Sequence, residues 1–297
     1  MTILSALGAK GFRLFFLVSG VFAVAVVPLW VWSLTGGSAP QGVLSGVTWH
    51  AHEMIFGFTV AVIAGFLLTA VESWTKLPTL RGPWLLAVVG IWVAARVGLW
   101  WPGWVGPALD LVFLPLVTLG IARPLWESRN TRNLPFVGLL GGLWLANLTV
   151  YLDAAGVLPG AAVTAHRSAV HVIAVIILVV AGRVVPMFTR NATGDERVHR
   201  LVGLDRVAIG ATLALAVLQV WPTSMLTGAV AILAGAATLG RMWGWWTPGV
   251  ATRPLLWVLH LGHASVGAGL ALSALPAFGI PIGSSALHLI TVGASAC

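Results

Sequence analysis

The chain has 297 residues, of which 59% are hydrophobic and only 8% are charged, so it cannot present a polar shell to water. This composition excludes a soluble globular protein and predicts a polytopic membrane protein. The net charge of +8 does not indicate a nucleic-acid-binding protein, because the 16 Lys and Arg residues are spread between apolar segments. The single cysteine, Cys297, excludes an intrachain disulfide and a Cys-x-x-Cys metal motif.

Apolar segments of about eighteen residues or more recur along the chain, each long enough to cross a bilayer as a helix. A tenth segment begins near residue 283, where about fifteen residues give roughly 22 Å of helix. The predicted fold class is an all-α transmembrane helix bundle with about nine full spans plus a partial tenth, and residues 1–297 are predicted to form a single membrane-embedded domain. The nine full spans are expected near residues 14–34, 52–73, 84–101, 105–125, 134–152, 164–188, 204–221, 224–243 and 254–276.

Basic residues fall in alternate connections between these spans. The connections at residues 35–49 and 153–163, in contrast, carry none. Because basic residues are retained on the cytoplasmic side of a membrane, this alternation predicts a cytoplasmic N-terminus. Tryptophans gather at the predicted span ends, where their amphipathic rings favour the membrane interface.

The second predicted span begins with a cluster of side chains that can bind metal: His50, His52, Glu53 and Met54. Imidazole and thioether groups are ligands of copper, and imidazole also ligates haem iron. Glu53 can alternatively accept a hydrogen bond from a ligating imidazole, or lie in the hydrated interface. Ionisable groups at the edge of lipid are costly, so this cluster is the first candidate site.

The sixth predicted span adds His166 at the same side of the membrane and His171 about 7 Å deeper. In the partial tenth span His288 is similarly shallow, so five histidines are expected to share one depth. Any one of them can instead be a hydrogen bond between helices. Arg183, near the other side, can pair with a haem propionate or another buried anion, or extend to the lipid phosphates.

A second, deeper layer is predicted in the ninth span, where His260 and His263 are three residues apart and lie on one helix face. His199, in a charged loop, is expected to be solvated. Arg96 and Asp110, near the ends of neighbouring spans, are interpreted as a structural pair.

Several segments of this sequence resemble the NnrS family. They are WHAHEMIFGF (49–58), IAGFLLTA (63–70), RNLP (132–135), GRVVPMFTRN (182–191), LLWVLH (255–260) and HLITVGA (288–294). The resemblance runs through essentially the whole chain, and the histidines at matching positions are His50, His52, His260 and His288. The chain departs from the family at Ala181, where glycine is usual, and it stops at Cys297, where the family continues with further spans.

The resemblance implies a multi-pass protein of the bacterial inner membrane that contains haem and copper and takes part in nitric oxide metabolism or the response to nitrosative stress. We therefore expect haem and copper as cofactors and nitric oxide or a related small molecule as a partner. The expected haem residues are His52, His171, His260, His288 and Arg183, and the expected metal residues are His50, His52, Glu53, Met54 and His166. A small-solute or metal-ion transporter is the alternative, although the sequence has no clear inverted repeat.

Overall fold

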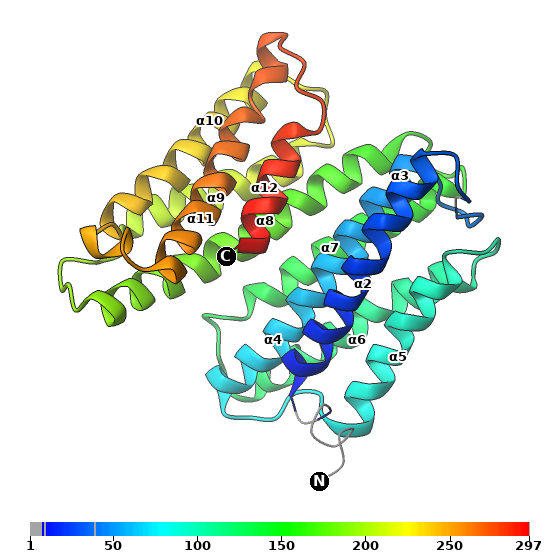
Figure 1. The fold of residues 1–297 in the computed structure, drawn as a ribbon, viewed down its shortest axis with the longest axis horizontal. Coiled ribbons are helices and arrows are strands. Elements are labelled where there is room, and N and C mark those ends of the chain that lie inside the picture. The colour runs from blue at the N-terminus through cyan, green and yellow to red at the C-terminus, as the bar shows by residue number, and fades with distance from the viewer. Residues whose placement is uncertain (1–7, 9, 39, 297) are drawn as a thin grey trace. The chain divides into compact units, whose positions relative to one another are not determined.

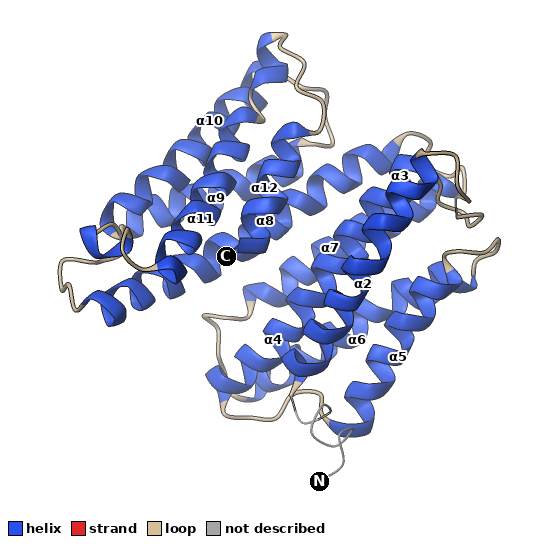
Figure 2. Cartoon of the chain, in the orientation of Figure 1, coloured by secondary structure: helices blue, strands red, loops and turns tan. Residues whose placement is uncertain are grey.

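The computed structural model describes residues 8, 10–38 and 40–296, and these residues form helices and connecting loops with no strand (Figure 2). The first half contains α2 (Gly11–Leu34), α3 (Gly46–His52), the π-helix η1 (Glu53–Thr59), α4 (Val60–Thr75), α5 (Gly82–Gly98), α6 (Val105–Glu127) and α7 (Pro135–Ala154). The second half contains α8 (Ala161–Thr193), α9 (Val202–Leu218), α10 (Met225–Gly240), the 3-10 turns η2 (Arg241–Gly244), η3 (Pro248–Val250) and η4 (Leu275–Phe278), α11 (Pro254–Leu272) and α12 (Ser285–Ala296). The all-helical fold class is thus confirmed for the described residues.

The chain divides into two compact units between His166 and Arg167, inside α8 (Figure 1). In unit 1, α2 packs on α4, and α5, α6 and α7 pack in sequence. In unit 2, α10 packs on both α9 and α11, and α12 packs on α11. The expectation of one membrane-embedded domain stays a prediction.

Seven of the helical segments within the described residues are long and apolar enough to cross a membrane, and α5 is a shorter apolar helix. The predicted count of nine full spans is therefore not confirmed. The predicted seventh span became α9, which has 17 residues and a rise of roughly 26 Å, less than the hydrocarbon core of about 30 Å. The seven are Gly11–Leu34, Gly46–Thr75, Val105–Glu127, Pro135–Ala154, Ala161–Thr193, Met225–Gly244 and Pro254–Phe278.

For most spans the predicted ends lie within a few residues of the observed helix ends, because proline and glycine mark them. Proline lies in the first turn of α5, α7 and α11, where a missing N–H has no cost. The partial tenth span corresponds to α12, although its last predicted residue, Cys297, lies outside the described residues. The sixth span was predicted too short, since α8 continues through Pro186 to Thr193.

The orientation of the helices in the membrane can be tested with reporter fusions. We expect alkaline phosphatase fused after Gly37 to be active, because the connection after α2 is predicted to lie outside the cytoplasm. The same enzyme fused after Leu77, in the basic connection after α4, is expected to be inactive. Activity in the reverse pattern would contradict the cytoplasmic N-terminus.

Candidate functional site

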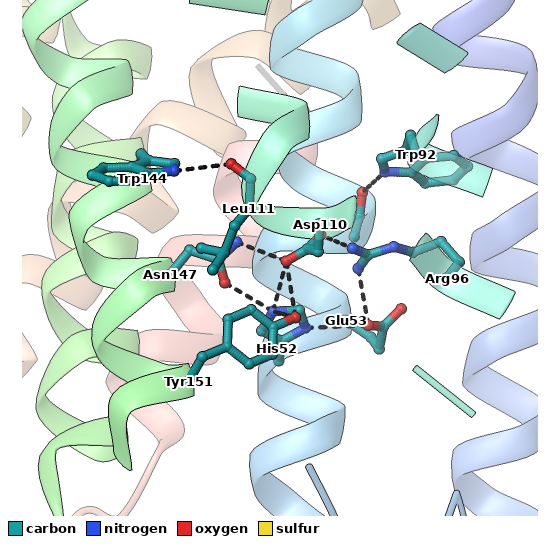
Figure 3. A network of polar contacts seen from close by, with 10 residues as sticks. His52, Glu53, Trp92, Arg96, Asp110, Leu111, Trp144, Asn147 and Tyr151 are labelled. Atoms are coloured by element: carbon teal, nitrogen blue, oxygen red, sulfur yellow. Dashed lines mark hydrogen bonds and ion pairs between the residues drawn. The ribbon is translucent and has the colours of Figure 1, made fainter. Parts of the chain in front are cut away.

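A network of buried polar side chains lies in unit 1, where four helical segments meet (Figure 3). His52 and Glu53 come from the junction of α3 and η1, and Arg96 comes from α5. Asp110 comes from α6, and Asn147 and Tyr151 come from α7, one helical turn apart. All six residues are buried, with His52 at 0% exposure.

His52 lies at the centre of this network, and both of its ring nitrogens are in contact with polar atoms. Nδ1 lies 3.1 Å from Glu53 Oε1, while Nε2 lies 2.9 Å from Asn147 Oδ1 and 3.1 Å from the Tyr151 hydroxyl. Asp110 Oδ2 is 3.2 Å from the same Nε2. A metal ion bound at His52 would have to replace one of these contacts.

The two carboxylates of the network are joined by one arginine. Arg96 Nη1 donates to Glu53 Oε1 at 2.9 Å, and Arg96 Nη2 forms an ion pair with Asp110 Oδ1. Asp110 Oδ2 also accepts hydrogen bonds from Asn147 Nδ2 at 2.7 Å and from the Tyr151 hydroxyl at 3.0 Å. The predicted pairing of Arg96 with Asp110 is confirmed, and it belongs to a larger charge network around His52.

The helix carrying Glu53 is locally widened into the π-helix η1, a feature that often marks functional sites. Thr59 supports it, because its hydroxyl donates to the carbonyl of Met54 at 2.8 Å. A Cβ atom at Gly57 would come within 3.1 Å of both Arg96 Nη1 and Glu53 Oε2. Glycine at this position therefore leaves room for the Arg96–Glu53 pair.

A cavity of about 150 Å³ lies beside this network in unit 1. Thr48, which lines it, is one turn before His52 on α3, and Val150 and Asp153 lie on either side of Tyr151 in the sequence. Asp153 accepts hydrogen bonds from the backbone N–H groups of Gly160 and Ala162 at 2.9 and 2.8 Å. The cavity is lined by Val43, Leu44, Ser45, Thr48, Val150, Asp153, Ala154 and Ala162.

The other residues of the predicted metal set also lie in unit 1. His50 stacks on Trp30 with ring centroids 4.6 Å apart. His166 is buried, and its ring lies 6.2 Å from Phe56, whose ring is 5.2 Å from His52. The Nε2 atom of His166 has no hydrogen-bond partner among the described residues. The Phe56 ring therefore lies beside His52 and His166, the two most buried histidines of the metal set.

Three histidines of unit 2 share one arrangement. In His171, His260 and His288, Nδ1 donates to the backbone carbonyl four residues earlier, at 2.7, 2.8 and 2.9 Å. This bond places the proton on Nδ1 and leaves Nε2 as an electron-pair donor. The Nε2 atoms of His171 and His260 are buried without a hydrogen-bond partner among the described residues, whereas His288 is exposed.

Helix contacts place His260 at a different level of unit 2 from His171. His260 follows Leu259, which belongs to the same buried cluster as Ala181 and Val185 of α8. His171 precedes Ala181 by ten residues, or ~15 Å of helix rise. One metal ion therefore cannot be ligated by both His171 and His260. Arg183, beside this cluster, is half-buried and has an interaction partner.

The unit 2 histidines fit haem by their donor chemistry. A porphyrin supplies four nitrogen ligands, so one or two axial side chains complete the iron site. Histidines that ligate metals usually donate their other N–H to a carbonyl or carboxylate, as His171, His260 and His288 do. Among residues 8, 10–38 and 40–296, no three His, Cys, Asp or Glu side chains are grouped to hold a metal ion.

The sequence analysis missed three residues of these buried clusters. Asn147 and Tyr151 were not identified, although Tyr151 is the only tyrosine of the chain and lies one turn after Asn147. Arg241 was interpreted only as a topology signal, yet its side chain is fully buried against Asp205 in unit 2. A buried arginine is identifiable from sequence only when its carboxylate partner is also known.

Comparison with known proteins gives one match. The family model described as NnrS protein matches residues 6–297. No curated protein and no solved structure matches the chain. Since the match covers nearly the whole sequence, and seven helices are suited to crossing a membrane, the chain is a multi-pass membrane protein that belongs to the NnrS family.

Proposed function

We propose that this protein binds haem in unit 2 and copper in unit 1, and that it takes part in nitric oxide metabolism or the response to nitrosative stress at the bacterial inner membrane. Membership of the NnrS family supports the connection with nitric oxide. The observation that carries the haem proposal is the shared geometry of His171, His260 and His288, in which Nδ1 is bonded to a helix carbonyl.

In this proposal, Nε2 of His171, His260 or His288 would bind the haem iron. The carbonyl bond at Nδ1 holds the ring orientation and increases the basicity of Nε2. Arg183 is proposed to pair with a propionate. When bound, haem would supply an iron centre for a diatomic ligand such as nitric oxide.

The copper site is proposed at the metal set of unit 1, whose side chains would have to move together, because no three His, Cys, Asp or Glu side chains are grouped to hold a metal ion among the described residues. His166 offers a buried Nε2 without a hydrogen-bond partner within the described residues. His50 and Met54 are the further proposed donors. His52 and Glu53 are also proposed to contribute. To bind the metal, His52 would give up its contact with Asn147, and Glu53 would give up its contact with Arg96.

Histidine replacement tests the proposal. We expect His171→Ala, His260→Ala or His288→Ala to lower the haem content of the purified protein, because the axial nitrogen is lost. His199→Ala is the matched control, since His199 also donates Nδ1 to a carbonyl but lies in the charged loop between α8 and α9 rather than on a helix. The measurement is the ratio of haem to protein at equal yield. Full haem content in all three variants would contradict the proposed ligands.

A further inference from the structure

A second buried charge cluster lies in unit 2, beside the buried residues Ala181, Val185 and Leu259. Arg241, in η2, is 0% exposed, and its Nε lies 3.0 Å from Asp205 Oδ1. Its Nη2 donates to the carbonyl of Leu178 in α8 at 2.9 Å. A Cβ atom at Gly182 would collide with Nη2, so glycine there is what allows the guanidinium to reach α8.

The charges of this cluster do not balance. Asp205 also accepts hydrogen bonds from Arg200 Nε and Nη2, at 3.0 and 2.6 Å on Oδ2. One carboxylate therefore faces two guanidinium groups, which leaves one positive charge. The Arg200 side chain is 38% exposed and therefore solvated, but the fully buried Arg241 shares its one carboxylate with Arg200, so an anion beside Arg241 would lower the cost of burying its charge.

Buried donors without partners occur on Arg241 itself and on the residues three before and four after it in the sequence. Arg241 Nη1, Trp245 Nε1 and the Thr238 hydroxyl have no hydrogen-bond partner among the described residues, and all three side chains are fully buried. The Arg241 guanidinium lies 4.8 Å from the Trp245 ring, which is 4.7 Å from the ring of His263. Buried donors are nearly always hydrogen-bonded, so unpartnered ones beside a cation indicate a missing acceptor.

We propose that this cluster, defined as Arg200, Asp205, Thr238, Arg241 and Trp245, binds one monovalent oxyanion or carboxylate. Its two oxygens accept from Arg241 Nη1 and Trp245 Nε1, and its single negative charge balances the cluster. The proposal does not involve the copper site, but the cluster borders the proposed haem residues, because Trp245 packs with Leu259, next to His260, and Arg241 lies against Gly182, next to Arg183. An oxyanion suits Arg241 because Nη1, the guanidinium nitrogen that is not used for Asp205 or Leu178, can donate a charge-assisted hydrogen bond to one of its oxygens.

The anion reaches the cluster from the loop between α8 and α9. Asp195 of this loop accepts two hydrogen bonds from the Arg197 guanidinium. These bonds hold the pKa of the Asp195 carboxyl below its usual range. Arg200 is partly exposed on the same loop while its guanidinium contacts Asp205. It therefore forms a basic entrance that attracts anions.

Binding can be measured on the full chain in detergent, with ¹³C-labelled formate and with nitrate as probes. We expect formate to bind, as shown by broadening of its ¹³C resonance, and nitrate to displace it. Arg241→Lys and Trp245→Phe are each expected to raise the formate Kd about tenfold, since each removes a hydrogen bond to a charged group. Arg206→Gln, which removes an exposed charge nearby, should leave the Kd unchanged.

A carboxylate that belongs to a larger bound molecule would have the same chemistry, and mass spectrometry of an organic extract distinguishes it from a free anion. A carboxylate other than haem that co-purifies with the unaltered protein but not with Arg241→Lys supports the site, with an organic ligand as the source, whereas haem alone in the extract does not. Trp245→Phe keeps the aromatic ring, so it remains informative if Arg241→Lys fails to fold. Absence of both formate binding and a co-purified carboxylate, or equal formate affinity in Trp245→Phe, would overturn the proposal.

Discussion

Asp110→Ala is expected to lower the free energy of unfolding by about 3–5 kcal/mol, the usual effect of removing one partner of a buried ion pair. Arg96 would keep only Glu53 as a charged partner. The donors of Asn147 and Tyr151 would also lose their acceptor in a region that water does not reach. The measurement is equilibrium unfolding of the purified protein in mixed detergent micelles.

The matched control for this change is an exposed pair in the same unit. Arg123 and Glu127 form a contact of 2.7 Å on the surface of α6, with side-chain exposures of 82% and 48%. Glu127→Ala should produce no resolvable change, because exposed ion pairs contribute little. If Asp110→Ala were as stable as Glu127→Ala, the network in Figure 3 would not stabilise unit 1.

Gly235→Ala is expected to destabilise unit 2 by about 1–3 kcal/mol, the range for overpacking a tightly packed core. A Cβ atom at this position of α10 would lie 2.6 Å from the backbone nitrogen of Ala271 and 2.7 Å from the carbonyl oxygen of Gly267, both in α11. Since backbone atoms cannot rotate away, the two helices would have to separate. The unfolding measurement used for Asp110 reports this change.

Gly210→Ala in α9 is the control for Gly235→Ala. No atom lies within 4 Å of a Cβ at Gly210, so alanine there should leave stability unchanged or raise it by about 0.5–1 kcal/mol through its better helix propensity. Small residues at helix contacts are a general feature of packing in membranes. Equal stability of the two alanine variants would show that α10 and α11 do not pack through Gly235.

Hydrophobic length predicted the positions of the helices because each apolar segment ends at charged residues, glycine or proline. It did not predict the π-helix, which depends on contacts of Glu53, Gly57 and Thr59 rather than on hydropathy. It also placed the start of the second span near residue 52, whereas α3 begins at Gly46. Polar residues before His52 lower the hydropathy of this segment. Hydropathy alone therefore did not show that the helix begins at Gly46.

The candidate site was predictable where unusual residues stand in apolar sequence. His52 and Glu53 were identified as site candidates in this way, Arg96 and Asp110 were predicted only as a structural pair, and the structure brings all four into one network. Asn147 could not be found, because a neutral amide in a helix has no periodic or charge signal. Arg241 was missed because the residues that surround it come from α8, α9 and α10, and their contacts depend on how these helices pack.

The visible absorption spectrum of the purified full chain, with its haem and copper content, tests the central claim most directly. We expect a Soret band that shifts when nitric oxide is added, because nitric oxide would bind the haem iron, together with copper that co-purifies with the protein. A colourless, metal-free protein that is folded and that stays metal-free after incubation with haem and copper would contradict it.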